Sequence, residues 1–172
     1  MSVIASFVVG ANGASSLDGS SRALSTDADR ARFLQRHRAA AAFIIGKRSA
    51  AREHYGSKAV PIFVYSRSSE PIQFNHPMMQ QITVDRNLKE ITQLIDLRIE
   101  GDIVVEAGYG LLLPMIKEGV IDILELSLSP IEGDDDYVDL EEMLANFEIT
   151  REIEIDGTRL LECRYQRDPA DS

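Results

Sequence analysis

The sequence predicts a single three-layer α/β/α domain over residues 1–172, with a mixed, mostly parallel central sheet and an antiparallel C-terminal hairpin. Its 172 residues, 44% of them hydrophobic, are enough for one buried core. Strand-like apolar runs alternate with helical segments over the first two thirds of the chain, as parallel crossover units require. The last third contains Asp156-Gly157 between two alternating segments, a pattern typical of a hairpin.

The chain begins with a strand, a loop and a helix. Val3–Val9 is apolar and rich in β-branched residues, which indicates a buried strand. Glycines after it open an irregular loop that runs to about Leu24. Ser25-Thr26-Asp27 then supplies N-cap residues for an arginine-rich helix that ends near Ala40.

Two further strands follow, with a short helix between them. Ala42–Ile45 is a buried strand that stops at Gly46, and Lys47–Tyr55 has the polar composition of a short surface helix. Ala59–Tyr65 is the next strand. Alternation of this kind predicts parallel neighbours in one sheet.

The middle of the chain predicts two weaker strands and then a strongly marked helix, strand and helix. Pro71–Phe74 and Gln81–Val84 are the weak strands. Asn87–Arg98 is amphipathic and begins at a capping residue. Asp102–Glu106 has the apolar run of a parallel strand, and Gly108–Lys117 continues directly as a helix.

The C-terminal region predicts a long alternating strand at Ile121–Ser129 and a hairpin of Phe147–Ile155 and Thr158–Arg167 around Asp156-Gly157. A hairpin loop one residue longer than Asp156-Gly157 would place apolar residues opposite each other across the last two strands. We therefore predict a bulged loop. This register pairs Ile153 with Leu161 and Ile149 with Tyr165.

Composition excludes several classes of protein. The net charge of −10 argues against nucleic-acid binding, and no apolar run approaches the roughly 18 residues that span a bilayer. A single cysteine and an N-terminal segment without a basic region predict a cytoplasmic protein. The acidic segment Glu132–Asp136 is interpreted as a solvated loop. We expect no metal site, because His37, His54 and His76 lack ligand spacing.

Glu106-Ala107-Gly108-Tyr109-Gly110 is the strongest local motif, because it lies where a strand turns into a helix. Glycines at such a turn let backbone N–H groups approach a phosphate at the positive end of the helix. A Rossmann fingerprint would need a third glycine in the next turn, where the sequence has Leu111–Leu113. The turn alone therefore indicates only an anion site.

Two other polar segments follow predicted strands, Gly46-Lys47-Arg48-Ser49 and Ser66-Arg67-Ser68-Ser69. Ligands of open α/β sheets bind at the carboxyl ends of the strands. Paired arginine and serine would suit a ribose 2′-phosphate, since arginine offers a planar fork of donors and serine a compact hydroxyl. Ordinary solvated loops are the alternative.

Taken in order, these segments give the chain a family resemblance. Ser16-Leu17-Asp18-Gly19, the arginine-rich helix, the strand that ends at Gly46, the Val-Val-Glu-x-Gly turn and Glu118–Asp122 together span nearly the whole chain. This order resembles the reductase domain of the riboflavin-biosynthesis deaminase-reductases. These domains belong to the dihydrofolate-reductase-like superfamily.

The resemblance implies a cofactor and a reaction. NADPH would be held at its 2′-phosphate by Gly46, Arg48, Ser49, Ser66 and Arg67, and at its pyrophosphate by Ala107, Gly108, Tyr109 and Gly110. The implied reaction is reduction of a pyrimidine or pterin-like heterocycle, as in 5-amino-6-(5-phosphoribosylamino)uracil reductases. The resemblance also implies a homodimer formed near the C-terminal hairpin.

The same resemblance assigns the substrate residues. Glu106 and Asp18 are the catalytic candidates, and the substrate contacts would come from Asn12, Ser16, Asp18 and Arg22. The residues themselves leave other roles open: Glu106 could accept local backbone N–H bonds, and Asp18 precedes a glycine in an ordinary turn. Asp27 is either an acid near the site or a helix-capping residue.

Two departures keep a second function open. Ala107 stands where relatives commonly have the first glycine of a pair, and Ser20 stands where riboflavin-pathway reductases often have a basic residue. The alternative is a non-catalytic or degenerate nucleotide-binding member of the same fold. Such a protein could be a dimeric regulatory or structural protein.

Overall fold

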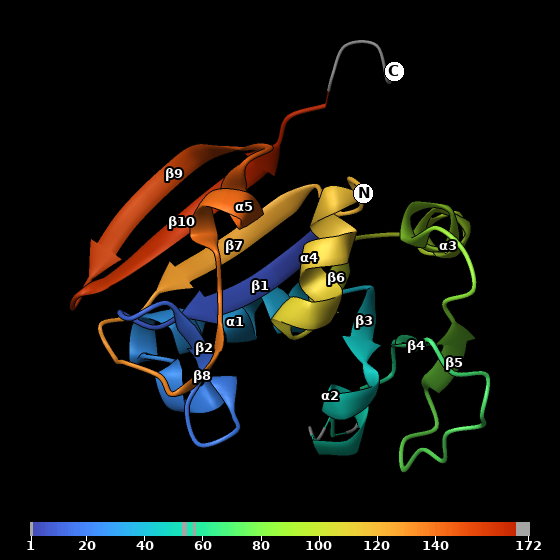
Figure 1. Cartoon of the computed structure of the whole chain (residues 1–172). Coiled ribbons are helices and arrows are strands. Elements are labelled where there is room, and N and C mark those ends of the chain that lie inside the picture. Colours follow the sequence, from blue (N-terminus) through green and yellow to red (C-terminus); the bar gives the residue numbers. More distant parts are fainter. Residues whose placement is uncertain (1, 53–54, 57, 168–172) are drawn as a thin grey trace.

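The fold is built on one eight-stranded mixed sheet. The computed structural model describes residues 2–52, 55, 56 and 58–167. The strand order is β5-β4-β3-β6-β1-β7-β10-β9, and a separate two-stranded sheet joins β2 to β8 (Figure 1). The strands are β1 (Val3–Val9), β2 (Ala14–Ser16), β3 (Ala42–Gly46), β4 (Ile62–Ser66), β5 (Met79–Thr83), β6 (Ile103–Glu106), β7 (Ile123–Leu128), β8 (Asp135–Tyr137), β9 (Phe147–Ile155) and β10 (Thr158–Tyr165).

Helices cover both faces of the sheet, with α1 and α4 on opposite sides (Figure 1). The helices are α1 (Asp27–Ala39), α2 (Lys47–Arg52), α3 (Leu88–Asp96), α4 (Tyr109–Lys117) and α5 (Leu140–Leu144), with a 3-10 turn η1 (Ser21–Leu24). In the eight-stranded sheet all neighbours from β5 to β7 pair in parallel, and β10 pairs antiparallel with β7 and with β9. The predicted fold class is confirmed.

Parallel pairing places the glycine-containing and arginine-containing segments at one edge of the sheet. Because β4, β3, β6 and β1 are parallel neighbours, the residues that follow Ser66, Gly46, Glu106 and Val9 leave the sheet on the same side. The register supports this, since Gly46 pairs with Tyr65, and Ile45 with Glu106. Binding sites of open α/β sheets lie at this edge.

The core under α3 and α4 is aliphatic. Helix α3 buries one apolar face. Helix α4 begins after the short turn that follows β6, and it packs beside α3 on the same core. The buried residues of these helices that join the core are Leu88, Ile91, Ile95, Leu112, Met115 and Ile116. They pack against alternate residues of the strands, among them Ala5, Ile44 and Val105. Burial of such side chains stabilises the fold by about 1.5 to 3 kcal/mol each.

Local signals in the sequence fix the helix starts. Thr26 caps α1 through its hydroxyl, which accepts the N–H of Asp29, and the Asn87 side chain accepts the N–H groups of Lys89 and Glu90 at α3. Both caps confirm the predicted starts. Asp27 lies in the first turn of α1 and is exposed.

The predicted hairpin register is wrong. Thr158 pairs with Ile155 and Leu161 with Glu152, so the loop contains only Asp156 and Gly157. Their φ angles of 50° and 81° are those of a two-residue turn with both residues in the left-handed region, which this dipeptide favours. The turn therefore decides the register.

The extra residue of the hairpin lies inside the strands instead of in the loop. A register shift between Glu162 and Cys163 leaves Ile149 opposite Cys163 and Phe147 opposite Tyr165. The predicted pairing of Ile149 with Tyr165 is therefore also wrong. A bulge at an edge strand absorbs the additional residue and restores the apolar pairing at this end of the hairpin.

Three other expectations differ from the structure. Pro71–Phe74 is not a strand: proline has no N–H to donate, and the N–H of Ile72 donates to the side chain of Gln81. Strand β4 begins later than predicted, at Ile62 directly after Pro61. The acidic segment is not simply a solvated loop, because Asp135–Tyr137 pairs with Ala14–Ser16 as β8.

Candidate functional site

The two segments that contain arginine and serine, Gly46–Ser49 and Ser66–Ser69, lie as predicted at the carboxyl ends of neighbouring strands. Helix α2 starts directly after Gly46, and its first residues leave Arg48 exposed and Ser49 half-buried. Ser66 is buried, and its hydroxyl donates to the carbonyl of Ser68 and accepts the N–H of that residue. Arg67 is exposed. The serine of this segment therefore shapes the turn, while both arginines face solvent.

The glycine turn leaves the start of α4 open. Gly108 is the N-cap residue, and no side chain of the described residues makes a capping bond there. Apart from the adjacent residues and the backbone of α4 itself, no heavy atom of the described chain would lie within 4 Å of a Cβ placed on Gly108 or Gly110. The first N–H groups of a nine-residue helix thus remain open to an anion.

Other residues place this turn beside the ends of β3 and β1. A Cβ on Gly46 would lie 3.7 Å from the Leu111 side chain, in the first turn of α4. The ring of Tyr109 lies 6.4 Å from that of Phe7 on β1, measured between centroids. The structure therefore brings Gly46, Tyr109 and the turn together.

The Glu106 carboxylate is held by two side chains from other elements. Its Oε1 accepts a hydrogen bond from His37 Nδ1 at 2.6 Å, and its Oε2 accepts one from the Tyr55 hydroxyl at 3.1 Å. The side chains of Glu106 and His37 are 13% and 18% exposed. The sequence singled out Glu106 but not these partners, which lie 69 and 51 positions away.

The predicted substrate residues fall into two groups. Asn12 and Ser16 bond internally: the Asn12 amide exchanges hydrogen bonds with the Gly133 backbone at 2.8 and 3.0 Å, and the Ser16 hydroxyl donates to Asp136. Asp18 and Arg22 are exposed. Asn12 and Ser16 are therefore bonded within the chain, although Asn12 is also exposed, and Asp18 and Arg22 are exposed.

Asp18 occupies a tight turn. Its φ of 52° is left-handed, and its N–H donates to both carboxylate oxygens of Asp134. The guanidinium of Arg52, at the end of α2, donates to the carbonyl of Gly19 at 3.2 Å. The turn role left open for Asp18 is present, and the carboxylate itself faces solvent.

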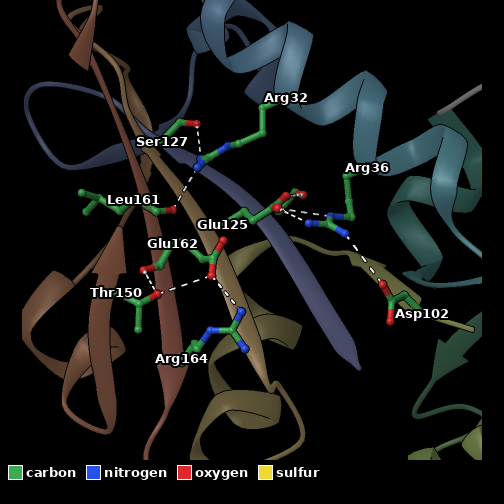
Figure 2. A network of polar contacts seen from close by, with 10 residues as sticks. Arg32, Arg36, Asp102, Glu125, Ser127, Thr150, Leu161, Glu162 and Arg164 are labelled. Carbon is green, nitrogen blue, oxygen red and sulfur yellow. Dashed lines mark hydrogen bonds and ion pairs between the residues drawn. The ribbon is translucent and has the colours of Figure 1, made fainter. Parts of the chain in front are cut away.

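A polar network between α1 and the sheet was not predicted from the sequence. Arg36 donates to Glu125 of β7 through Nε at 3.1 Å and through Nη2, and its Nη1 lies 3.8 Å from Asp102. Arg32 donates to the Ser127 hydroxyl and to the carbonyl of Leu161 (Figure 2). The helix is thus attached to the sheet by charged side chains.

Burial and pairing change the arginine pKa values in opposite directions. Burial lowers the pKa of Arg32, against the opposing effect of Glu125 and Asp29. The hydrogen bond to Glu125 raises the pKa of Arg36. Asp29 accepts bonds from Ser25 and Ser127 and faces the sheet, a position that the sequence analysis did not assign to it. His54 lies outside the described residues.

Comparison with known proteins shows the fold. No protein-family model and no curated protein matches the chain. Among solved structures, dihydrofolate reductase from Enterococcus faecalis complexed with NADP(H) superposes with a TM-score of 0.67 at 14% identity, over 97% of both chains. The chain has a dihydrofolate-reductase-like fold. The fold named by the sequence resemblance is confirmed.

Two further structures share this dihydrofolate-reductase-like fold. A pyrimidine reductase-like protein from Corynebacterium diphtheriae gives a TM-score of 0.71 at 16% identity, over 97% of this chain and 92% of that one. A diaminohydroxyphosphoribosylaminopyrimidine deaminase/5-amino-6-(5-phosphoribosylamino)uracil reductase from Thermotoga maritima gives 0.70 at 14% identity. That match covers 95% of this chain and 56% of the Thermotoga protein, so the chain spans little more than half its length.

No helix in the described part of the chain is both long and apolar enough to cross a membrane.

Proposed function

We propose that the protein is an NADPH-dependent reductase of a pyrimidine or pterin-like heterocycle, similar to 5-amino-6-(5-phosphoribosylamino)uracil reductases. One observation carries the proposal. The segments that begin at Gly46, Ser66 and Glu106 leave three adjacent parallel strands at the same edge of the sheet. Two of them bear exposed arginines, and the third bears an open helix start.

The residues present fit the dinucleotide. The open space at Gly108 and Gly110 accommodates close approach of a pyrophosphate to the backbone, where the α4 dipole favours negative charge. Arg48 and Arg67 are exposed at the neighbouring strand ends, where guanidinium groups can bind a 2′-phosphate. Ala107 is half-buried beside this turn and blocks neither feature.

The protein's part in the reaction is to bind and orient. Bound NADPH would supply the hydride. Asp18 and Arg22, exposed on the segment after β1, would contact the heterocycle and its polar substituents, while Asn12 and Ser16 hold that segment against Gly133 and Asp136. Glu106 would stay bonded to His37 and Tyr55 beneath the cofactor turn. Much of the rate increase of such a site comes from orientation.

A second candidate is a nucleotide-binding protein of this fold without turnover. The observation that favours it is the internal bonding of Asn12 and Ser16, which removes two of the four predicted substrate contacts. Ala107 and Ser20 also differ from the residues that reductases commonly have at these positions, and both differences favour a protein without turnover. NADPH binding without oxidation in the presence of pyrimidine or pterin substrates would support this candidate.

We also propose a homodimer through the outer strand β9. On this edge strand Ile153 and Ile155 share one face and are 39% and 43% exposed, whereas the register shift places Ile149, 47% exposed, on the other face. Exposed apolar side chains along an unpaired strand edge favour association.

The cofactor assignment is tested by titrating NADPH and NADH into the wild type, Arg48→Ala and the matched control Arg98→Ala. Arg98 is exposed beyond the end of α3, and the control removes the same charge. We expect the wild type to prefer NADPH. Arg48→Ala should weaken NADPH binding by about tenfold or more, the loss of one charge-assisted contact, with NADH unaffected. Equal binding of the two nucleotides by the wild type would contradict the 2′-phosphate assignment.

A further inference from the structure

We propose that His37 is a positioning residue for the nucleotide turn, acting through Glu106. The inference rests on the proposed function, because the turn it positions is the proposed pyrophosphate site. It gives Glu106 an anchoring role in place of the catalytic role that the family resemblance implies. The carboxylate that ends β6 would hold three elements of the site at fixed separation.

The contacts of Glu106 reach helix α1 and the segment that follows helix α2. His37 lies in the last turn of α1, and Tyr55 lies three residues after the end of α2, the helix that bears Arg48. Glu106 itself lies two residues before Gly108, the N-cap of α4. One carboxylate therefore connects α1, the segment after α2 and the turn.

The partners of Glu106 are themselves fixed in place. The His37 ring lies 4.6 Å from the Phe43 ring and stacks on Tyr55 at 6.0 Å, measured between centroids. Lys58 donates to the His37 carbonyl at 2.9 Å. A donor that is locked by packing directs the carboxylate more narrowly than a mobile surface side chain would.

The chemistry of the pair explains why its loss should move the turn. An ionised carboxylate only accepts hydrogen bonds, so Nδ1 of His37 must carry the proton of the 2.6 Å contact. Charge-assisted bonds of this kind are short and strong. Without His37, Glu106 would keep the Tyr55 bond but lose its connection to α1, and the residues that follow it would be less restrained.

The test compares His37→Leu, which removes the donor, with His37→Asn, whose amide can place an N–H near the former Nδ1. Amide hydrogen exchange is measured in the nucleotide-free protein at Leu111 and Leu112, whose N–H groups donate to the Gly108 carbonyl at 3.1 and 3.0 Å. Ile91, which donates to Asn87 in α3, is the internal reference. We expect faster exchange at Leu111 and Leu112 in His37→Leu, recovery in His37→Asn and no change at Ile91.

Titration with NADPH then separates this inference from the proposed function. His37→Leu should bind NADPH about tenfold more weakly, the equivalent of one hydrogen bond, and His37→Asn close to the wild type. Unchanged exchange at Leu111 and Leu112 in His37→Leu would overturn the inference whatever the affinity. Altered exchange with no NADPH binding by the wild type would support the positioning role and overturn the proposed function.

A second variant keeps the test decisive if His37→Leu does not fold. Tyr55→Phe removes the other donor to Glu106 and keeps the ring that packs on His37. It should also speed exchange at Leu111 and Leu112 without affecting Ile91. Equal exchange in Tyr55→Phe and the wild type would then count against anchoring through Glu106.

Discussion

The two faces of the sheet are held to their helices by different forces. Under α3 and α4 the contacts are aliphatic, with Leu112, Met115 and Ile116 buried against the strands. Under α1 none of the 13 residues of the helix, all of them described, is fully buried, and charged side chains join it to β7 beside a smaller apolar cluster that includes Phe43, Ile45 and Val104. Apolar packing is nondirectional, whereas hydrogen-bonded charges fix one orientation.

The polar face joins the helix to specific strands. Glu125 is 6% exposed, and besides Arg36 it accepts a bond from the Ser6 hydroxyl at 3.4 Å. Arg32 and Asp29 both bond to Ser127. The position of α1, and with it that of His37, therefore depends on a few charged groups, and each of them is costly to leave unpaired.

The largest effect should follow from breaking the pair between Arg36 and Glu125. Arg36→Met leaves a buried carboxylate without its main partner and should destabilise the protein by about 4 kcal/mol. The double variant Arg36→Met/Glu125→Leu replaces the pair with apolar side chains and should recover most of this loss. Urea unfolding of the wild type, both single variants and the double variant gives the coupling free energy.

The apolar face supplies the control for this cycle. Leu112→Ala should cost about 3 kcal/mol through lost burial and a cavity, without an unpaired charge to remove. If the double variant on the polar face were as unstable as Arg36→Met alone, the loss would not come from an unpaired buried charge. The contrast between the two faces would then be wrong.

The same contrast explains what the sequence could predict. Apolar runs identify strands and helices because hydrophobic periodicity follows secondary structure, and Thr26 and Asn87 cap their helices locally. Polar contacts have no such period. The pairs His37 with Glu106 and Arg36 with Glu125 join residues 69 and 89 positions apart. Nothing in the local sequence distinguishes these four residues from charged residues that face solvent.

Short polar strands escape prediction for a related reason. Strands β2 and β8 have three residues each, and they pair across about 120 positions through Ala14 with Tyr137 and Ser16 with Asp135. The hairpin is different, because the signal was present in Asp156-Gly157. Apolar pairing and turn geometry favour different registers in this hairpin, and the backbone preference of the dipeptide decides between them.

A smaller effect, on the apolar face, should appear at alkaline pH. Burial raises the pKa of Tyr65 from 10.0 to about 12, so the folded state favours the neutral phenol. The stability linked to this neutral phenol is fully present below pH 10 and is lost as the pH rises toward 12. The free energy of unfolding should have fallen by about 1 kcal/mol at pH 11. Urea unfolding between pH 8 and 11 should show the loss.

Cys163 contributes to the same alkaline loss, because burial raises its pKa from 9.0 to about 11. Tyr65→Phe separates the two groups. It removes the titrating phenol, and also the bond to Thr92, so its stability at pH 8 is the reference for its own curve. An equally steep decline in Tyr65→Phe would assign the effect to other residues.

The smallest effect on stability should come from the part of the polar face that α1 does not cover. Ile153 pairs with Leu160, which pairs with Ser127 under α1, so directly opposite residues place Ile153 on the same face of the sheet. Ile153→Lys should change the free energy of unfolding of the subunit by less than about 0.5 kcal/mol, since the side chain is largely exposed.

The same variant, Ile153→Lys, should nevertheless halve the mass measured by solution scattering at micromolar concentration. Glu154→Lys, on the opposite side of the same strand, is the matched control and should leave the mass unchanged. A wild type of monomer mass would show that these isoleucines do not form a subunit interface, and that the uncovered end of the polar face is apolar for another reason.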